Sequence, residues 1–209
     1  MTIRYRSNSP RERKNLEMAE TLPVDKHLAT WARKSGQASP IRIPRLDRKR
    51  LMQLYGQWGF KRGAEIGVDG GTFSSYMFGV IPGLELIGVD PWQRDINGHE
   101  SRKRRQAESF LNDKQWRQMH MTSEMAAPQI EDGSLDFVYI DGAHQFDFVM
   151  LDLILWNRKV RKGGMISGHD YYRFRDGGVV PAVDAFVHAR GPRQWFLTDE
   201  RTPSFFWIK

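Results

Sequence analysis

From residue 47 onward, short strand-like apolar runs alternate with segments of helical periodicity. Apolar residues recur every three or four positions in the helical segments, whereas the strand-like runs are brief and nearly continuous. The expected strands cover residues 63–68, 84–90, 118–123, 135–142 and 163–170, and the expected helices cover 47–60, 72–81, 99–115, 146–160 and 179–190. Such alternation is typical of parallel βαβ units with right-handed crossovers. Two successive strands in residues 194–209 complete a predicted seven-stranded, mostly parallel α/β sheet with a C-terminal antiparallel hairpin.

Length and composition limit the class of protein. A chain of 209 residues suits one domain with a full-sized core. The absence of cysteine excludes disulfides, thiolate metal ligands and a cysteine nucleophile. No apolar run approaches the roughly 18 residues that span a bilayer, and the first twenty residues lack the apolar stretch of a secretory signal. We therefore predict a cytoplasmic protein with no membrane partner.

The positive charge is concentrated near the N-terminus. The net charge is +7, and residues 1–50 hold 13 Lys and Arg against 5 Asp and Glu, whereas the remainder holds 19 against 20. We predict a basic, partly helical arm over residues 1–46, followed by one domain over residues 47–209. Such an arm either binds a polyanion or packs across the domain or a partner subunit, which would give a homo-oligomer. A second basic run, RKRR, occupies residues 102–105.

Polar and acidic residues follow several of the expected strands at the edge where parallel sheets bind ligands. The first strand runs into the glycine-rich segment EIGVDGGTFSS, where the backbone can turn tightly beside a helix N-terminus. The next strand ends at Asp90, 25 residues after Glu65, a spacing at which an acid can bind both ribose hydroxyls of an adenosine. Two later strands end in YIDGAH and SGHDY. Because a desolvated carboxylate is costly unless it is paired or ligated, Asp141 and Asp170 indicate a functional cluster.

Four segments together resemble the class I S-adenosylmethionine-dependent methyltransferases: AEIGVDGG, LIGVDPW, SLDFVYIDGAH and DLILWNRKVRKGGMISGHDY. The resemblance covers roughly residues 48–172 and is strongest to the branch of sugar O-methyltransferases that act on antibiotics. It implies a doubly wound Rossmann-like fold and S-adenosylmethionine as the cofactor. The cofactor-binding residues that it implies are Glu65, Gly67, Val68, Gly71, Thr72, Asp90 and Ser123. Asp69 replaces a common glycine, and its charge would repel a dinucleotide pyrophosphate, which disfavours an NAD-dependent enzyme.

The same resemblance implies a role for the Asp/His clusters. In the sugar O-methyltransferases, acids at the Asp141 position and at the position of the pair His169-Asp170 hold a divalent cation that acidifies the acceptor hydroxyl. The implied metal ligands are Asp141, His169 and Asp170, the implied metal is magnesium or manganese, and the implied catalytic residues are His144, as general base, and Asp141. His169 replaces a carboxylate of those relatives. An imidazole there either favours manganese, iron or zinc or marks a branch that has lost the metal.

Other residues near these motifs have simpler interpretations. His144 could instead cap the next helix, and His169 could stack on Tyr171. Asp147 and Asp152 are expected to be solvated or capping residues of the helix over 146–160, and Trp92 is expected as a lid over the adenosine.

The sequence thus predicts an S-adenosylmethionine-dependent methyltransferase that O-methylates a small hydroxylated acceptor, such as a sugar or polyol, with assistance from a divalent metal. The alternative is a nucleic-acid-associated methyltransferase or binding protein whose basic arm and RKRR run engage phosphates. Against it, the chain has no NPPY-like segment of the kind found in amino-methylating DNA enzymes.

Overall fold

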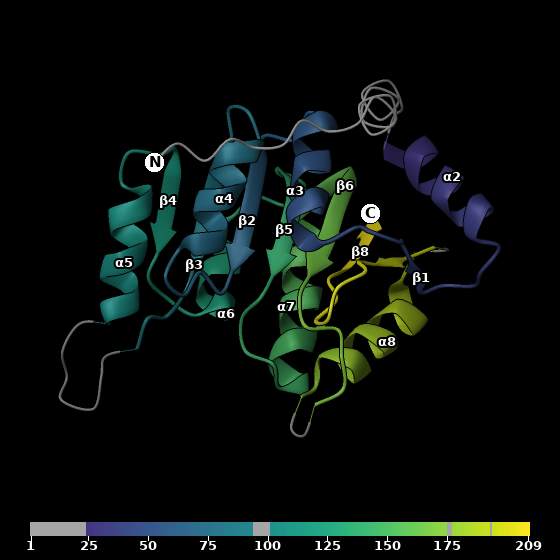
Figure 1. Ribbon diagram of the computed structural model, residues 1–209. Coiled ribbons are helices and arrows are strands. Elements are labelled where there is room, and N and C mark those ends of the chain that lie inside the picture. The colour runs from purple at the N-terminus through teal and green to yellow at the C-terminus, as the bar shows by residue number, and fades with distance from the viewer. Residues whose placement is uncertain (1–23, 94–100, 175–176, 193) are drawn as a thin grey trace.

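The computed structural model describes residues 24–93, 101–174, 177–192 and 194–209 (Figure 1). Within these residues, the strands form one sheet in the order β1-β7-β8-β6-β5-β2-β3-β4. Neighbouring strands are parallel except where β8 pairs with β6 and β7. The strands are β1 (Ile41–Arg42), β2 (Arg62–Ile66), β3 (Glu85–Val89), β4 (Trp116–Met119), β5 (Leu135–Ile140), β6 (Val160–Gly168), β7 (Phe196–Leu197) and β8 (Phe205–Ile208). The predicted mostly parallel sheet with an antiparallel C-terminal hairpin is confirmed, with one strand more than the seven expected.

Helices cover both faces of the sheet. They are α2 (Val24–Ser35), α3 (Arg48–Gln57), α4 (Thr72–Val80), α5 (Arg102–Leu111), α6 (Ser123–Ala126), the 3₁₀ helix η1 (Ala127–Gln129), α7 (Phe146–Lys159) and α8 (Val179–Arg190). None of the helices in the described ranges has the length and apolar character needed to cross a membrane.

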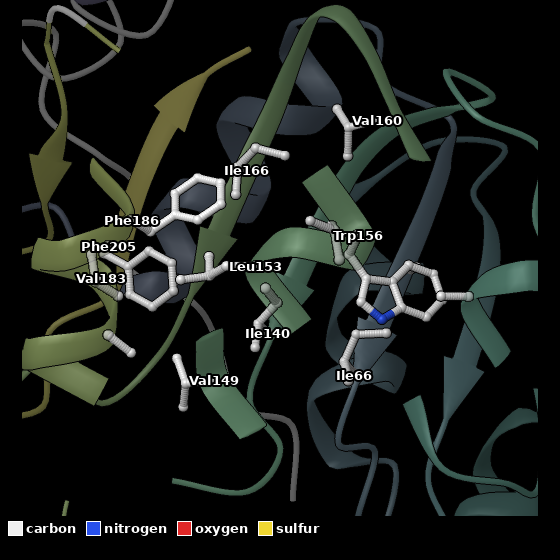
Figure 2. Packing of buried hydrophobic residues seen from close by; sticks show 14 of the residues in the cluster. Ile66, Ile140, Val149, Leu153, Trp156, Val160, Ile166, Val183, Phe186 and Phe205 are labelled. Carbon is white, nitrogen blue, oxygen red and sulfur yellow. The ribbon is translucent and has the colours of Figure 1, made fainter. Parts of the chain in front are cut away.

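The alternation of side chains along β5 divides the core into two layers. Phe137 and Tyr139 pack with the buried residues of α2, α3 and α4, whereas Val138 and Ile140 pack with those of α7 and α8. Successive side chains of a strand point to opposite faces, so a fully buried strand reads as a continuous apolar run. Figure 2 shows the second layer, in which Trp156 and other side chains of α7 lie against the sheet.

The residues just before the domain boundary expected at residue 46 also contribute to the core. Leu28 of α2 and Ile41 of β1 are buried, and β1 pairs in parallel with β7. The strand β1 was not predicted because two residues carry no periodicity, and its only paired neighbour lies about 155 positions later in the chain. The division of the chain at residues 46 and 47 stays a prediction.

The weak strand expected over residues 118–123 is shorter than expected. β4 ends at Met119, and α6 already begins at Ser123. Thr122 occupies the N-cap position in extended conformation, a position that threonine and serine favour. The strand prediction was therefore wrong for residues 120–123, where the helix-start preference dominates.

Candidate active site

The carboxyl ends of four parallel strands form one row across the sheet. Ile66 of β2 lies beside Val89 of β3 and Ile140 of β5, and Ile140 lies beside Gly168 of β6. Parallel strands in this register place the residues that follow them at a common edge. The structure thereby brings together four of the predicted site residues: Gly67, Asp90, Asp141 and His169.

The loop between β2 and α4 requires glycine at two points. Gly67 has a φ of 91°, and a Cβ atom there would lie 2.2 Å from the carbonyl oxygen of Asp141. Gly71 has a φ of 74° and precedes α4 as its N-cap. Because Gly71 has no side chain to cap α4, the first N–H groups of this helix remain available to a ligand or to water. Thr72 is exposed at this helix start, and Val68 is buried below the loop.

Glu65 is buried at the end of β2 with 1% of its surface exposed. Its Oε2 atom accepts a hydrogen bond from the Ser74 hydroxyl in α4. Burial raises the pKa of Glu65 to about 8, an effect that the Ser74 hydrogen bond opposes. The carboxyl group is therefore largely protonated near neutral pH, and its contact with a cofactor stays a prediction.

Backbone groups hold the carboxylate of Asp90 in place. The N–H of Asp69 donates to Oδ2 at 2.9 Å, and the N–H of Trp92 donates to Oδ1 at 2.8 Å. A carboxylate has about four acceptor sites, so each oxygen can still accept a ribose hydroxyl. The side chain of Asp69 points elsewhere, since its Oδ2 lies 2.7 Å from Lys103 Nζ.

Trp92 does not form the exposed lid that the sequence suggested. Only 4% of its surface is exposed, and it packs with Val68 and with Ala107 and Leu111 of α5. Its indole N–H donates to the carbonyl oxygen of Asp69 at 2.8 Å. The prediction was wrong because α5 folds over this side of the glycine loop, and the sequence alone does not show that contact. Trp92 instead holds the glycine loop in place through its contacts with Asp69 and Val68.

Ser123 is bonded to the helix that follows β5. Its hydroxyl donates to Asp152 and accepts a hydrogen bond from the indole N–H of Trp156 at 2.7 Å. Asp152 is buried rather than solvated, which corrects the expectation from sequence. Burial raises the pKa of Asp152 to about 6, although the hydrogen bond from Ser123 opposes this shift. These hydrogen bonds join the start of α6 to α7 at Ser123, the residue that is expected to contact adenine.

Asp141, His169, Asp170 and His144 form one cluster, as the sequence predicted for the ends of β5 and β6. His169 Nδ1 lies 3.2 Å from Asp170 Oδ1 and 3.5 Å from Asp141 Oδ1. His144 Nε2 lies 3.0 Å from Asp170 Oδ2. Although burial opposes it, hydrogen bonding to Asp141 and Asp170 raises the pKa of His169 to about 9. Hydrogen bonding from His169 in turn lowers the pKa of Asp170.

Arg48 is a member of this cluster that sequence reasoning missed. It is the first residue of α3, and its Nη1 atom lies 3.5 Å from Asp141 Oδ2. The guanidinium carbon also lies 4.9 Å from the ring centroid of Phe73. No local motif marks Arg48, because it is one of five basic residues between positions 42 and 50. The sequence shows that this segment is basic, but it does not show that the Arg48 side chain reaches the site.

The donor atoms available for a metal differ from the predicted set. Asp141, His144 and Asp170 each offer one ligand atom, and these atoms lie within 4.8 Å of one another. His169, the predicted ligand, has Nδ1 between the two carboxylates, and its Nε2 lies 3.3 Å from Thr202 Oγ1. Both ring nitrogens of His169 thus already face protein groups. If a cation binds here, the geometry favours His144 over His169 as the nitrogen ligand.

Two further features border the site. A hollow of about 460 Å³ is lined by Arg173, Phe174, Gly177, Val180, Pro181 and Asp184. The Phe174 ring contacts the His144 ring edge to face at 5.7 Å, so this hollow adjoins the cluster.

The basic run RKRR lies in α5, where Lys103 pairs with Asp69 and Arg104 pairs with Glu108. Lys103 and Arg104 are thus engaged within the chain.

Comparisons with known proteins agree with this architecture. A family model described as a methyltransferase domain matches residues 64–171. Uncharacterized protein R132 of Acanthamoeba polyphaga mimivirus is 31% identical over 129 residues, which cover 59% of this chain and 58% of the relative. The match thus spans less than two thirds of that relative's length.

Solved structures share the fold at low sequence identity. An O-methyltransferase from Bacillus cereus in complex with SAH is 18% identical with a TM-score of 0.56, over 94% of this chain and 97% of that chain. The O-methyltransferase TomG from Streptomyces achromogenes, involved in tomaymycin synthesis and solved in complex with SAM, is 14% identical with a TM-score of 0.57, over 97% of this chain and 100% of that chain. Because the family model covers more than half of its length, the chain belongs to the methyltransferase-domain family, and it shares its fold with these solved O-methyltransferases.

Proposed function

We propose that this protein transfers the methyl group of S-adenosylmethionine to a hydroxyl oxygen of a small acceptor, such as a sugar or polyol. The observation that carries the proposal is the row of strand ends. It sets the glycine loop and Asp90 next to a second group of functional side chains, which consists of Asp141, His144 and Asp170. The first group suits an adenosine and the second suits a reacting hydroxyl. The two structural neighbours in complex with SAH and SAM support this choice of cofactor.

Asp90 and the glycine loop would bind the cofactor. Asp90 keeps acceptor capacity for ribose hydroxyls while backbone N–H groups fix its orientation. At Gly67, the loop backbone packs so closely on Asp141 that any side chain would close the space between them. The Ser123 hydroxyl already bonds to Asp152 and Trp156. Ser123 would therefore contact adenine through its backbone rather than through its hydroxyl.

His144 and Asp170 would handle the proton of the acceptor. When bound, S-adenosylmethionine supplies an electrophilic methyl group, and the acceptor oxygen forms its new bond to carbon as the sulfur–carbon bond breaks. A proton on His144 Nε2 would face Asp170 Oδ2, which lies 3.0 Å away, and Nδ1 would then accept the hydroxyl proton. Asp141 would accept a hydrogen bond from the same hydroxyl and hold its oxygen in line with the methyl group.

The rest of the acceptor would occupy the hollow beside Phe174. Its lining combines apolar surface from Val180 and Pro181 with the charged groups of Arg173 and Asp184. A hydroxylated ring has the same mixture of apolar faces and polar edges. Metal assistance, which the sequence resemblance implied, would require a cation at Asp141, where Arg48 now lies.

A turnover assay tests this function. The protein is incubated with S-adenosylmethionine and a panel of sugars, polyols and phenols, and S-adenosylhomocysteine is quantified by mass spectrometry. We expect a hydroxylated acceptor to raise its formation well above the background without acceptor, and the product to carry one added methyl group on oxygen. No stimulation by any acceptor, or methylation on nitrogen, would contradict the proposal.

A further inference from the structure

Arg48 brings a permanent positive charge to the cluster of functional side chains. Its Nη1 atom lies 3.5 Å from Asp141 Oδ2, and both side chains are mostly shielded from solvent, with 34% and 21% of their surfaces exposed. A guanidinium group stays protonated at every pH that a folded protein tolerates. Asp141 therefore has a fixed cationic partner that belongs to the chain itself.

Three elements hold Arg48 in this position. Asp47 caps α3 by accepting a hydrogen bond from the N–H of Arg50, which fixes the first turn of the helix. The N–H of Arg48 itself donates to Glu200 Oε1 at 2.9 Å, in the turn between β7 and β8. Its guanidinium group lies over the ring of Phe73, in the first turn of α4. A cation stacked and anchored in this way loses little further freedom when it pairs with Asp141.

The carboxylates of the cluster are therefore already satisfied by protein groups. Arg48 and the Nδ1 atom of His169 face Asp141, while His169 and His144 face Asp170. A divalent ion bound to Asp141, His144 and Asp170 would lie close to the guanidinium group of Arg48, which is 3.5 Å from Asp141 Oδ2. Two like charges a few ångströms apart repel strongly where solvent is partly excluded. Arg48 therefore disfavours a divalent ion at Asp141, both in this set and in the set that the sequence resemblance implied, Asp141, His169 and Asp170.

We infer that Arg48 takes the place of a divalent cation at Asp141, so that the chain positions its acceptor without a metal. This inference rests on the proposed function, because it concerns the acceptor side of the same site. Arg48 acts as a positioning residue: it orients the Asp141 carboxylate, which holds the acceptor oxygen, while His144 removes the proton. The increased acidity that a metal would give the hydroxyl is replaced by a nearby base and a fixed positive charge.

A metal titration tests the inference. Mn²⁺ alone is titrated by calorimetry into the wild type, Arg48→Met and Lys49→Met. Lys49 is the matched control, because it follows Arg48 in α3 and its cation lies over Tyr76 rather than beside Asp141. We expect no saturable Mn²⁺ binding by the wild type or Lys49→Met. Arg48→Met, which removes the cation beside Asp141, should bind Mn²⁺ at one saturable site, and adding Asp141→Asn to this variant should abolish that binding.

Two results would overturn the inference. One is saturable Mn²⁺ binding by the wild type that Asp141→Asn removes. The other is an Arg48→Met protein that is folded by circular dichroism but gains no Mn²⁺ binding, since Arg48 would then occupy no cation site. If Arg48→Met does not fold, Arg48→Gln is used in its place, and the wild-type titration decides independently of both. S-adenosylhomocysteine binding is measured on the same samples: its absence would refute the proposed function, whereas its presence with wild-type Mn²⁺ binding would refute this inference alone.

Discussion

In the proposed reaction, proton removal depends on His144. Its ring contacts Phe174, which lines the hollow, and its Nε2 atom lies 3.0 Å from Asp170 Oδ2, so we propose that it receives the proton of the acceptor. General bases positioned in this way typically contribute about 10²- to 10⁴-fold to a rate. Asp141 has a different task, because it contacts Arg48 and His169 and would orient the acceptor oxygen.

We therefore predict that His144→Ala lowers the methyl-transfer rate about 10²-fold or more, with cofactor affinity unchanged. Asp141→Asn should also lower turnover while leaving S-adenosylhomocysteine affinity nearly intact. His188→Ala, an exposed histidine near the end of α8, is the matched control and should behave as the wild type. Initial rates and calorimetry on the same preparations check both effects. Full activity of His144→Ala would refute its role as the base.

Glu65 makes the stability of the fold depend on pH. Its pKa rises from 4.5 to about 8 on folding because burial disfavours the carboxylate. A raised pKa in the folded state stabilises the protein fully below the unfolded pKa, and this contribution is lost as the pH rises through the folded pKa. We predict that the wild type loses stability relative to Glu65→Gln between about pH 5 and pH 9, as measured by urea unfolding. The control Glu124→Gln, at an exposed position of α6, should run parallel to the wild type, and a parallel Glu65→Gln curve would contradict the assignment.

At the level of elements, α2 belongs to the folded core although it lies in the predicted arm. Leu28 is 3% exposed and packs in the same buried cluster as Tyr55 of α3 and Phe196 of β7. Removing most of a buried leucine side chain costs the transfer free energy and leaves a cavity, together about 2 to 5 kcal/mol. We predict that Leu28→Ala lowers the free energy of unfolding by about 2 to 3 kcal/mol. Lys26→Ala, on the exposed side of the same helix, should change it little, and equal effects of the two variants would place α2 outside the core.

The sequence predicted the elements that carry strong periodicity and missed those that depend on distant contacts. The strands that end in Asp90, Asp141 and the pair His169-Asp170 are long and apolar enough to read directly, and their common edge follows from parallel pairing. By contrast, β1 exists because β7 pairs with it, and Trp92 is buried because α5 covers it. Arg48 and Asp152 show the same limit: each was visible as a charged residue, but its partner could be known only after folding.

For the whole molecule, the proposed function rests on one sheet edge that gathers two different groups of side chains. The glycine loop after β2 and the acid after β3 suit an adenosine, while the clusters after β5 and β6 suit a reacting hydroxyl. The helix α3 then brings Arg48 over this edge from outside the sheet. The central claim is that the first half of this edge binds S-adenosylmethionine and its product.

Calorimetric titration of S-adenosylhomocysteine into the wild type, Asp90→Ala and Asp113→Ala tests that claim most directly. Asp113 is the matched control because it is exposed and pairs only with its neighbour Lys114 among the residues described. We predict one saturable site in the wild type and in Asp113→Ala. Asp90→Ala should weaken binding by about 1.5 to 3 kcal/mol, because ribose hydroxyls lose a charged acceptor. Absence of S-adenosylhomocysteine binding in the wild type, or saturable binding of NAD in its place, would contradict the account.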